Sequence, residues 1–186
     1  MFKSNFKKIT LIGGLVLLGV ATLVNANTDD IPTVQRVDLY KYSGQWHEVA
    51  RKPLYFQRVC DYNVTANYSL NKKGNIVVDN KCLSKSGKLN QSIGEAFIKN
   101  APKNSQLKVS FLPKIIRWLP VGRGDYWILK LDENYQTALV GSPNKKYLWV
   151  LSRDPNIDQQ ILDEYLDYAK TLGFDLSDII YTKQKP

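Results

Sequence analysis

The sequence has few of the residues on which metal binding and nucleophilic catalysis depend. Among 186 residues it holds one histidine, His47, and two cysteines, Cys60 and Cys82. A structural zinc site takes four cysteine, histidine or acidic ligands. The small number of cysteines and histidines therefore argues against a structural zinc site. The chain also shows no nucleophile elbow and no cysteine–histidine pair in a catalytic arrangement. We therefore expect no metal, no cofactor and no catalytic residue, and we predict that the protein is not an enzyme.

A single long uncharged and mostly apolar run is present, from Ile9 to Val24, and three lysines precede it. The run is short for a membrane span, which needs about 20 apolar residues. It ends in Val24-Asn25-Ala26, which fits the small-x-small rule for signal-peptidase cleavage. We predict that residues 1–26 form a signal peptide that is cleaved; an uncleaved anchor is the alternative.

Basic residues are in excess, but they are not concentrated. The formal net charge is +9, and removing the signal peptide, with three lysines and no acids, leaves +6. The basic residues are scattered in loops and form no dense stripe, so we expect no nucleic-acid partner. After a short lead at 27–35, residues 36–186 have the length of one domain with a proper core.

Short β segments follow one another through most of that domain. They are rich in Tyr, Val, Ile and Thr, and Gly, Pro, Asn and Lys fill the links between them. Eight strands with links mostly of hairpin length predict an all-β fold, an antiparallel up-and-down barrel without free edges. Such a barrel encloses room for one small ligand. The predicted strands are 44–51, 59–70, 75–83, 90–98, 106–112, 125–131, 136–141 and 147–152.

The periodicity changes after the last of these strands. Apolar residues then recur at helical spacing, in a segment that Asn156 and Gln159 are placed to cap and that Gly173 ends. We predict a C-terminal α-helix packed on the barrel wall, followed by a short final strand at 178–182. The apolar helix residues are Ile161, Leu162, Tyr165, Leu166 and Ala169.

The two cysteines are placed symmetrically about a turn. The midpoint between Cys60 and Cys82 is residue 71, where the turn Asn71-Lys72-Lys73-Gly74 begins. Strands that fold back at this turn bring the cysteines close to opposite each other, and in an exported protein this predicts a disulfide. Two unrelated buried thiols are the alternative.

The first and last strands carry a matched pair of residues. Gly44-Gln45-Trp46 opens the first strand, and Arg153 ends the last. A guanidinium lying over an indole face makes a favourable cation–π contact. We predict that Gly44, Trp46 and Arg153 form a structural floor that closes one end of the barrel.

These motifs resemble the lipocalin family, closest to bacterial outer-membrane lipocalins and apolipoprotein-D-like lipocalins. Gly44-Gln45-Trp46 matches the first family motif and Ser152-Arg153 the third, while Leu131–Tyr135 matches the second in part. The resemblance covers 36–182 and implies a lipocalin calyx that carries a hydrophobic molecule. The acylation cysteine of the lipoprotein members is missing, so we expect export to the periplasm or the periplasmic face of the outer membrane without a lipid anchor. His47 stands where a tyrosine is usual.

The family's strand alternation implies which side chains face the interior. The inward set is mainly apolar, as in small-molecule pockets; the alternative is that these side chains only fill the barrel. Glu48 needs a partner, for which Arg153 or Tyr126 is available, or it anchors a ligand head group. The predicted ligand-binding residues are Glu48, Ala50, Ala66, Val78, Asn80, Leu107, Val109, Phe111, Tyr126, Ile128, Val140 and Trp149.

Four loops are expected to lie at the open end, which we call the mouth. They are basic and contain no acid, and the third carries Ile115, Ile116, Arg117 and Trp118. Apolar side chains among cations suit the edge of an anionic bilayer, so we predict a membrane-docking loop; an inward-folded lid is the alternative. The mouth loops are 51–58, 83–88, 112–123 and the loop with Lys145-Lys146.

The resulting function is the binding and transport or storage of a small hydrophobic ligand, such as a fatty acid or lysophospholipid. An envelope scaffold or stress protein that acts through a protein partner is the second class, and a lipocalin-fold enzyme is the third. A copurifying lipid separates the first class from the second, and a turnover assay separates both from the third.

Overall fold

The computed structural model describes residues 31–185. The predicted signal peptide at 1–26 lies outside the described residues. Between residues 31 and 185, no helix is both long and apolar enough to cross a membrane.

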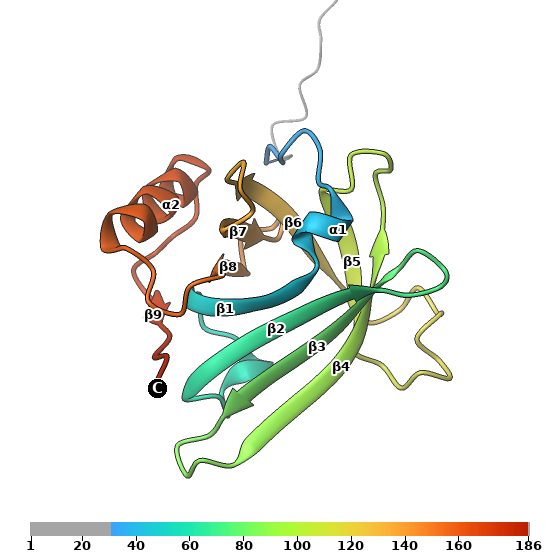
Figure 1. Ribbon diagram of the computed structural model, residues 1–186, viewed down its shortest axis with the longest axis horizontal. Helices are drawn as coiled ribbons and strands as arrows, with labels where there is room; N and C mark the ends of the chain where they lie inside the picture. Colours follow the sequence, from blue (N-terminus) through green and yellow to red (C-terminus); the bar gives the residue numbers. More distant parts are fainter. Residues whose placement is uncertain (1–30, 186) are drawn as a thin grey trace, which may run out of the picture.

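Eight antiparallel strands form the closed barrel that the sequence predicts (Figure 1). Each strand pairs with the next, and β1 closes the barrel by pairing with both β8 and β2. The predicted fold class is thus confirmed. The strands are β1 Gly44–Arg51, β2 Tyr62–Leu70, β3 Ile76–Leu83, β4 Leu89–Ile98, β5 Gln106–Ser110, β6 Arg123–Leu131, β7 Thr137–Gly141 and β8 Leu148–Ser152.

The second strand begins later than predicted. Its expected first residues belong to the connection that follows the 3-10 helix η1, Tyr55–Gln57. In this connection the Cys60 N–H donates to the Gln57 carbonyl, so the backbone there is turned and not extended. Asn63, with φ 51°, marks a further irregularity at the start of β2.

A bulge in β1 changes which side chains face the interior. Glu48 and Ala50 lie opposite adjacent residues of β8, so β1 holds one extra residue between them. Val49 and Ala50 consequently both pack into the cluster outside the barrel, while Arg51 lies beside Glu48. This corrects the expectation that Ala50 faces the cavity, which assumed uninterrupted alternation.

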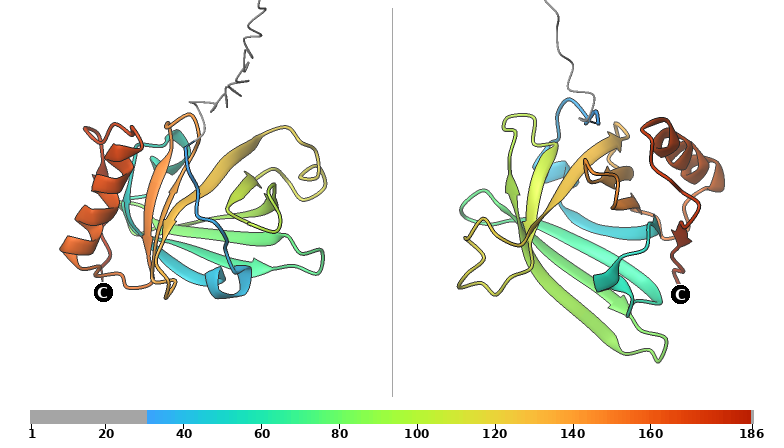
Figure 2. Two further views of the ribbon diagram at one scale, coloured as in Figure 1. Left: turned by 90° about the horizontal axis from the view of Figure 1, so that it is seen from above. Right: turned by 180° about the vertical axis from the view of Figure 1, so that it is seen from behind.

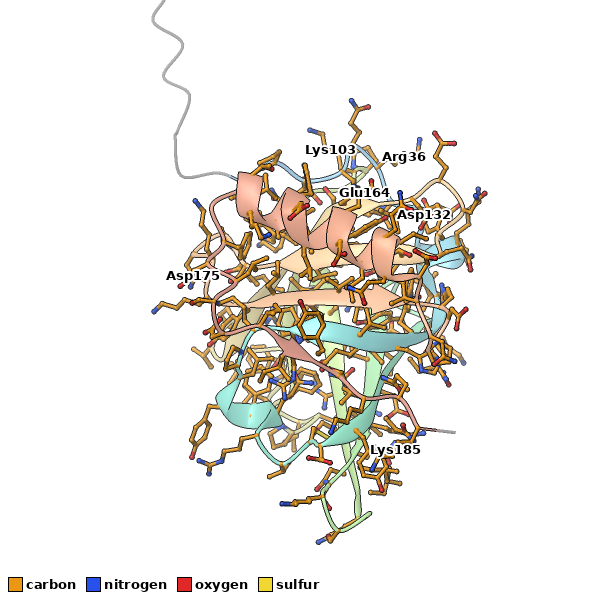
Figure 3. All side chains as sticks on the ribbon, turned by 90° about the vertical axis from the view of Figure 1, so that its left-hand side faces the viewer. Arg36, Lys103, Asp132, Glu164, Asp175 and Lys185 are labelled. Carbon is orange, nitrogen blue, oxygen red and sulfur yellow. A yellow bond between two sulfur atoms is a disulfide. The ribbon has the colours of Figure 1, made fainter. Side chains whose placement is uncertain are left out.

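The C-terminal segment fills a seam in the barrel wall. β1 pairs with β2 only through Gly44–His47. Beyond that point β9, Ile180–Tyr181, pairs with the mouth half of β1, and the Lys183 carbonyl accepts a hydrogen bond from the Asn63 N–H at 2.9 Å. The tail therefore bridges the two strands where they separate, and it ends near Lys185 in Figure 3.

The predicted wall helix is α2, Gln159–Thr171, and it lies outside the barrel near β7 and β8 (Figure 1). Its cap is Asp158, whose carboxylate accepts from the Gln160 N–H at 2.7 Å, and not the predicted Asn156. Asp158 is closer to the first helical turn, so its side chain reaches the free N–H groups. Gly173 follows the helix at φ +83°, a conformation that suits glycine.

A second helix, which is short, is not predicted from the sequence. This helix, α1, spans Leu39–Tyr42 and is capped by Asp38, which accepts from the Tyr40 N–H at 2.9 Å. A single helical turn is too short to show apolar periodicity. It lies just before Gly44, and therefore at the closed end of the barrel.

The apolar core has two parts on opposite sides of the wall. One fills the closed half of the barrel interior around Trp46, Leu107 and Ile128. The other lies between the outer wall and α2, around Leu139, Val150 and Ala169. Because α2 covers the wall from outside, the core does not need to fill the whole interior.

The predicted disulfide joins Cys60 and Cys82, whose Cα atoms are 5.5 Å apart. It links the connection after η1 to the mouth end of β3. The enclosed chain holds the whole β2–β3 hairpin.

Replacing both Cys60 and Cys82 with alanine should lower the free energy of unfolding by about 3 kcal/mol, because the sequence separation is 22 residues and the bridge restricts the unfolded chain. Urea unfolding followed by tryptophan fluorescence measures this difference. The wild type in reducing buffer is the control and should match the double variant. If the wild type has the same urea midpoint in oxidising and in reducing buffer, the prediction is contradicted.

Candidate functional site

A cavity of about 560 Å³ occupies the mouth half of the barrel interior. At one end it is lined by connecting segments with exposed side chains, among them Phe56 and Val59. At the other end it reaches the buried side chains of Tyr42 and Tyr68. It is therefore a cup that opens toward the mouth loops.

Polar side chains of this cup gather on the mouth half of β3 and β4. There Asn80 lies opposite Ser92, and Cys82 lies opposite Asn90, while Ile76, Val78 and Ala96 of the same strands are apolar. The facing side carries a charged residue, Asp125, and is otherwise mainly apolar and aromatic. Its apolar and aromatic residues are Leu107, Val109, Phe111, Tyr126, Tyr147 and Trp149.

Arg153 seals the closed end. Its guanidinium lies 3.9 Å from the centre of the Trp46 ring, and Trp46 is fully buried. Arg153 also donates to backbone carbonyls of the α1–β1 segment, including Gln45 at 2.6 Å and Ser43 at 2.8 Å. Gly44, at φ +97°, passes so close that a Cβ would lie 3.2 Å from Arg153 Nη1. Arg153 therefore lies against both of the other predicted floor residues, Gly44 and Trp46.

Three tyrosines separate this floor from the cavity. The Tyr126 hydroxyl lies 2.8 Å from that of Tyr42 and 3.0 Å from that of Tyr68. Burial raises the pKa of Tyr42 and Tyr126 well above the usual value, and that of Tyr68 to about 12. All three hydroxyls are therefore protonated near neutral pH. Tyr42 was not predicted, because it comes from the short helix α1.

Glu48 is buried beside the cavity with a full set of partners. Its carboxylate accepts from Thr182 Oγ1 at 2.6 Å and from Gln57 Nε2 at 2.8 Å. Arg51 Nε lies 3.0 Å away, as an ion pair without hydrogen-bond alignment. Burial raises the pKa of Glu48, and these partners offset the shift only in part. The partners expected from the sequence, Arg153 and Tyr126, are replaced because the bulge turns Arg51 toward Glu48.

Gln57 connects a mouth loop to the barrel interior. While its amide N–H donates to Glu48, its Oε1 accepts from Trp149 Nε1 at 3.1 Å. Gln57 lines the cavity, so it contributes a polar group at the side of the cup. Sequence reasoning placed it in a mouth loop and missed this contact, since nothing local signals an inward-pointing loop residue.

A second, smaller space of about 40 Å³ adjoins the cavity, and we call it the inner chamber. Glu48, Val64, Thr65, Ala66 and Leu151 line it. It shares four residues with the main cavity, which are Tyr68, Asn80, Tyr126 and Trp149.

The predicted ligand-binding residues fall into three groups. Glu48 and Ala66 line the inner chamber. Ile128 and Val140 are fully buried in the interior core and line neither space, and Ala50 packs outside the barrel because of the bulge. The remaining seven line the main cavity: Val78, Asn80, Leu107, Val109, Phe111, Tyr126 and Trp149.

The loop between β5 and β6 extends from the barrel in both views of Figure 2. Its backbone is held by Arg117, which donates to the carbonyls of Leu112 at 2.8 Å and Ile93 at 2.7 Å. Ile115 is 82% exposed and Trp118 is 70% exposed. The apolar side chains at its tip thus face solvent, whereas Leu112 at its base lines the cavity.

Within the described part of the chain, no group of three or more His, Cys, Asp or Glu side chains is placed to hold a metal ion.

Comparisons with known proteins agree on one family. A model of the lipocalin-like domain matches residues 37–184. The outer membrane lipoprotein Blc of Vibrio cholerae is 36% identical over 159 residues, covering 84% of this chain and 88% of the relative. Mouse apolipoprotein D is 34% identical over 161 residues, covering 82% and 80%. The solved structure of insecticyanin from Manduca sexta superposes with a TM-score of 0.64 at 22% identity, covering 83% of this chain and 84% of insecticyanin.

Changing Glu48 to Gln should lower the free energy of unfolding by about 3–5 kcal/mol at neutral pH, because it leaves the buried Arg51 without a counter-charge. Adding Arg51→Met should recover most of this loss, since neither charge is then buried. Urea unfolding of the two single variants and the double variant measures the coupling.

The control for this cycle is Asp167→Asn, which removes one partner of an exposed pair with Lys170 and should change stability little. A loss in the double variant equal to the sum of the losses in the two single variants would show that the two side chains are not coupled.

Proposed function

This chain belongs to the lipocalin family, and we propose that it binds a small hydrophobic molecule in its barrel and transports or stores it. The observation that carries the proposal is the cup of about 560 Å³, closed at one end and lined mainly by apolar and aromatic side chains. A cavity of this size with a few polar groups is usual for small-molecule sites. The barrel would also be stable with its interior filled, so an interior left open favours a ligand.

The ligand we propose is a fatty acid or a lysophospholipid. The apolar side of the cup, with Leu107, Val109 and Phe111, suits an aliphatic chain. The mouth loops contribute Lys85, Lys88 and several other cations without any acid, which favours an anionic head group there.

We propose the bacterial cell envelope as the place where the protein acts. The Cys60–Cys82 disulfide supports an oxidising compartment, and a similar protein of Vibrio cholerae is an outer membrane lipoprotein. The absence of a lipid anchor in the mature protein stays a prediction.

We also propose that the loop between β5 and β6 docks on anionic membrane. Ile115 and Trp118 are exposed at its tip, and Lys114 lies between its base and that tip. Solvent-facing apolar side chains next to a cation suit the interface of a bilayer. The inward lid receives less support, because these side chains point away from the cup.

A scaffold that acts through a protein partner would not need an open cup. Catalysis has no support in the acidic side chains at the cavity. Asp125 lines the cavity and pairs with Lys108, and Glu48 beside the cavity is occupied by its own partners. The scaffold is therefore the second candidate, and a bound lipid distinguishes the two.

Native mass spectrometry of residues 27–186, purified without detergent, should show one bound species with the mass of a fatty acid or lysophospholipid. Val109→Trp places a large ring in the cavity and should weaken lipid binding by about tenfold or more. Ile93→Trp on the exposed outer face of β4 is the matched control and should bind as the wild type does. A wild-type protein that is empty and also fails to bind added lipid would reject lipid carriage and favour the scaffold.

Changing Ile115 and Trp118 together to serine should weaken binding to vesicles containing anionic lipid by at least about tenfold, because each apolar side chain buried in the interface contributes about 1.5–3 kcal/mol. Vesicle cosedimentation measures this. Tyr40→Ser, which removes an aromatic side chain that is 83% exposed at the closed end, is the control and should bind normally. Unchanged binding by the loop variant would end the docking proposal.

A further inference from the structure

The inner chamber has a larger polar share in its lining than the main cavity has. With a volume of about 40 Å³ it has room for a group about the size of one water molecule. It shares lining residues with the main cavity, so a ligand that fills the cavity lies next to it.

Asn80 gives the chamber an acceptor without a donor. Its Oδ1 is buried and accepts no hydrogen bond from any residue between 31 and 185. Asn80 lines both the chamber and the main cavity. A buried carbonyl oxygen without a donor is costly, so a donor supplied from the cavity would be stabilised there.

The tyrosine cluster has a donor without an acceptor, because its hydroxyls carry one hydrogen more than the hydrogen bonds among them use. The hydroxyls of Tyr42, Tyr68 and Tyr126 bring three hydrogens, and their two mutual contacts consume two. The spare hydrogen lies on Tyr68, Tyr42 or Tyr126, depending on the direction of the two bonds. Tyr68 and Tyr126 line the inner chamber as well as the main cavity, whereas Tyr42 lines the main cavity alone, so two of the three arrangements place the spare hydrogen on a residue of the chamber.

Charge at the chamber favours a neutral occupant. Glu48 is its one charged lining residue, and Arg51 already compensates that carboxylate. An anion bound in the chamber would lie beside this carboxylate, and no further cation of the described chain lines the chamber to balance its charge. A cation would find both carboxylate oxygens occupied by Thr182 and Gln57.

We propose that the inner chamber binds one uncharged group that both donates and accepts a hydrogen bond, a hydroxyl or a protonated carboxyl, at the inner end of an aliphatic ligand. The group donates to Asn80 Oδ1 and accepts the spare tyrosine hydrogen. This inference rests on the proposed function and specifies it. The preferred ligand has a polar group at its inner end, and any charged head group stays at the mouth.

The test compares unsubstituted fatty acids with ω-hydroxy fatty acids of the same length, over a series of lengths, by tryptophan-fluorescence titration. At the best-fitting length the ω-hydroxy acid should bind about tenfold more tightly, because it makes two hydrogen bonds that the unsubstituted chain cannot make. Asn80→Leu should bring this ratio close to one, because the hydroxyl then has no acceptor in the chamber.

Asn90→Leu is the matched control, since Asn90 is a polar cavity residue nearer the mouth whose amide donates to the Lys88 carbonyl. This variant should keep the wild-type ratio. A wild-type ratio near one at every length overturns the inference without any variant, and so does an undiminished ratio in Asn80→Leu. If neither kind of acid binds, the proposed function is rejected and the inference with it. If both kinds bind with equal affinity, only the assignment of a polar group to the inner chamber is rejected.

Discussion

The open cup depends on how Arg153 closes the other end of the barrel. One guanidinium donates to several backbone carbonyls of α1, of Ser43 and of the start of β1, while its flat face covers Trp46. A charge there is acceptable because those carbonyls satisfy its N–H groups, and the planar shape allows stacking and hydrogen bonding together. With the end sealed in this way, the interior core can stop at the tyrosine cluster. The mouth half of the barrel then needs no filling side chains.

The wall of the cup depends on a second polar centre, at Glu48. Strands β1 and β2 separate beyond His47, and the C-terminal tail fills the seam. Glu48 joins the pieces that meet there: Arg51 beyond the bulge, Gln57 from the mouth loop and Thr182 from the tail. Its contacts thus tie together segments far apart in the chain. A buried carboxylate is costly, which is consistent with its raised pKa, so this centre specifies geometry more than it adds stability.

The barrel, its strand order, the wall helix and the disulfide follow from the sequence because each rests on a local pattern or a fixed symmetry. The strand alternation implied by the lipocalin resemblance predicts Val78, Leu107 and Trp149 as cavity residues, and all three line the cavity. Predictions about site residues were wrong or incomplete where one extra residue or a short helical turn interrupts the alternation of a strand. The β1 bulge moves Ala50 outside, and α1 and η1 bring Tyr42 and Gln57 inside without any periodic signal. Bulges are decided by pairing with a distant strand, so the local sequence does not contain them.

Polarity changes in order along the axis of the cup, and this order constrains the orientation of a ligand. The mouth loops are basic, the cavity is apolar on the side of Leu107 and Val109, and the inner chamber offers a neutral acceptor and a spare hydroxyl hydrogen. A charged head at the inner end would meet Glu48 and lose its water without gaining a counter-ion. The same head at the mouth keeps its hydration and lies among cations. The chain of an amphiphile is therefore expected to point inward. Asn80 and the tyrosines then contact the far end of the chain and select for its chemistry, while the head group stays at the mouth.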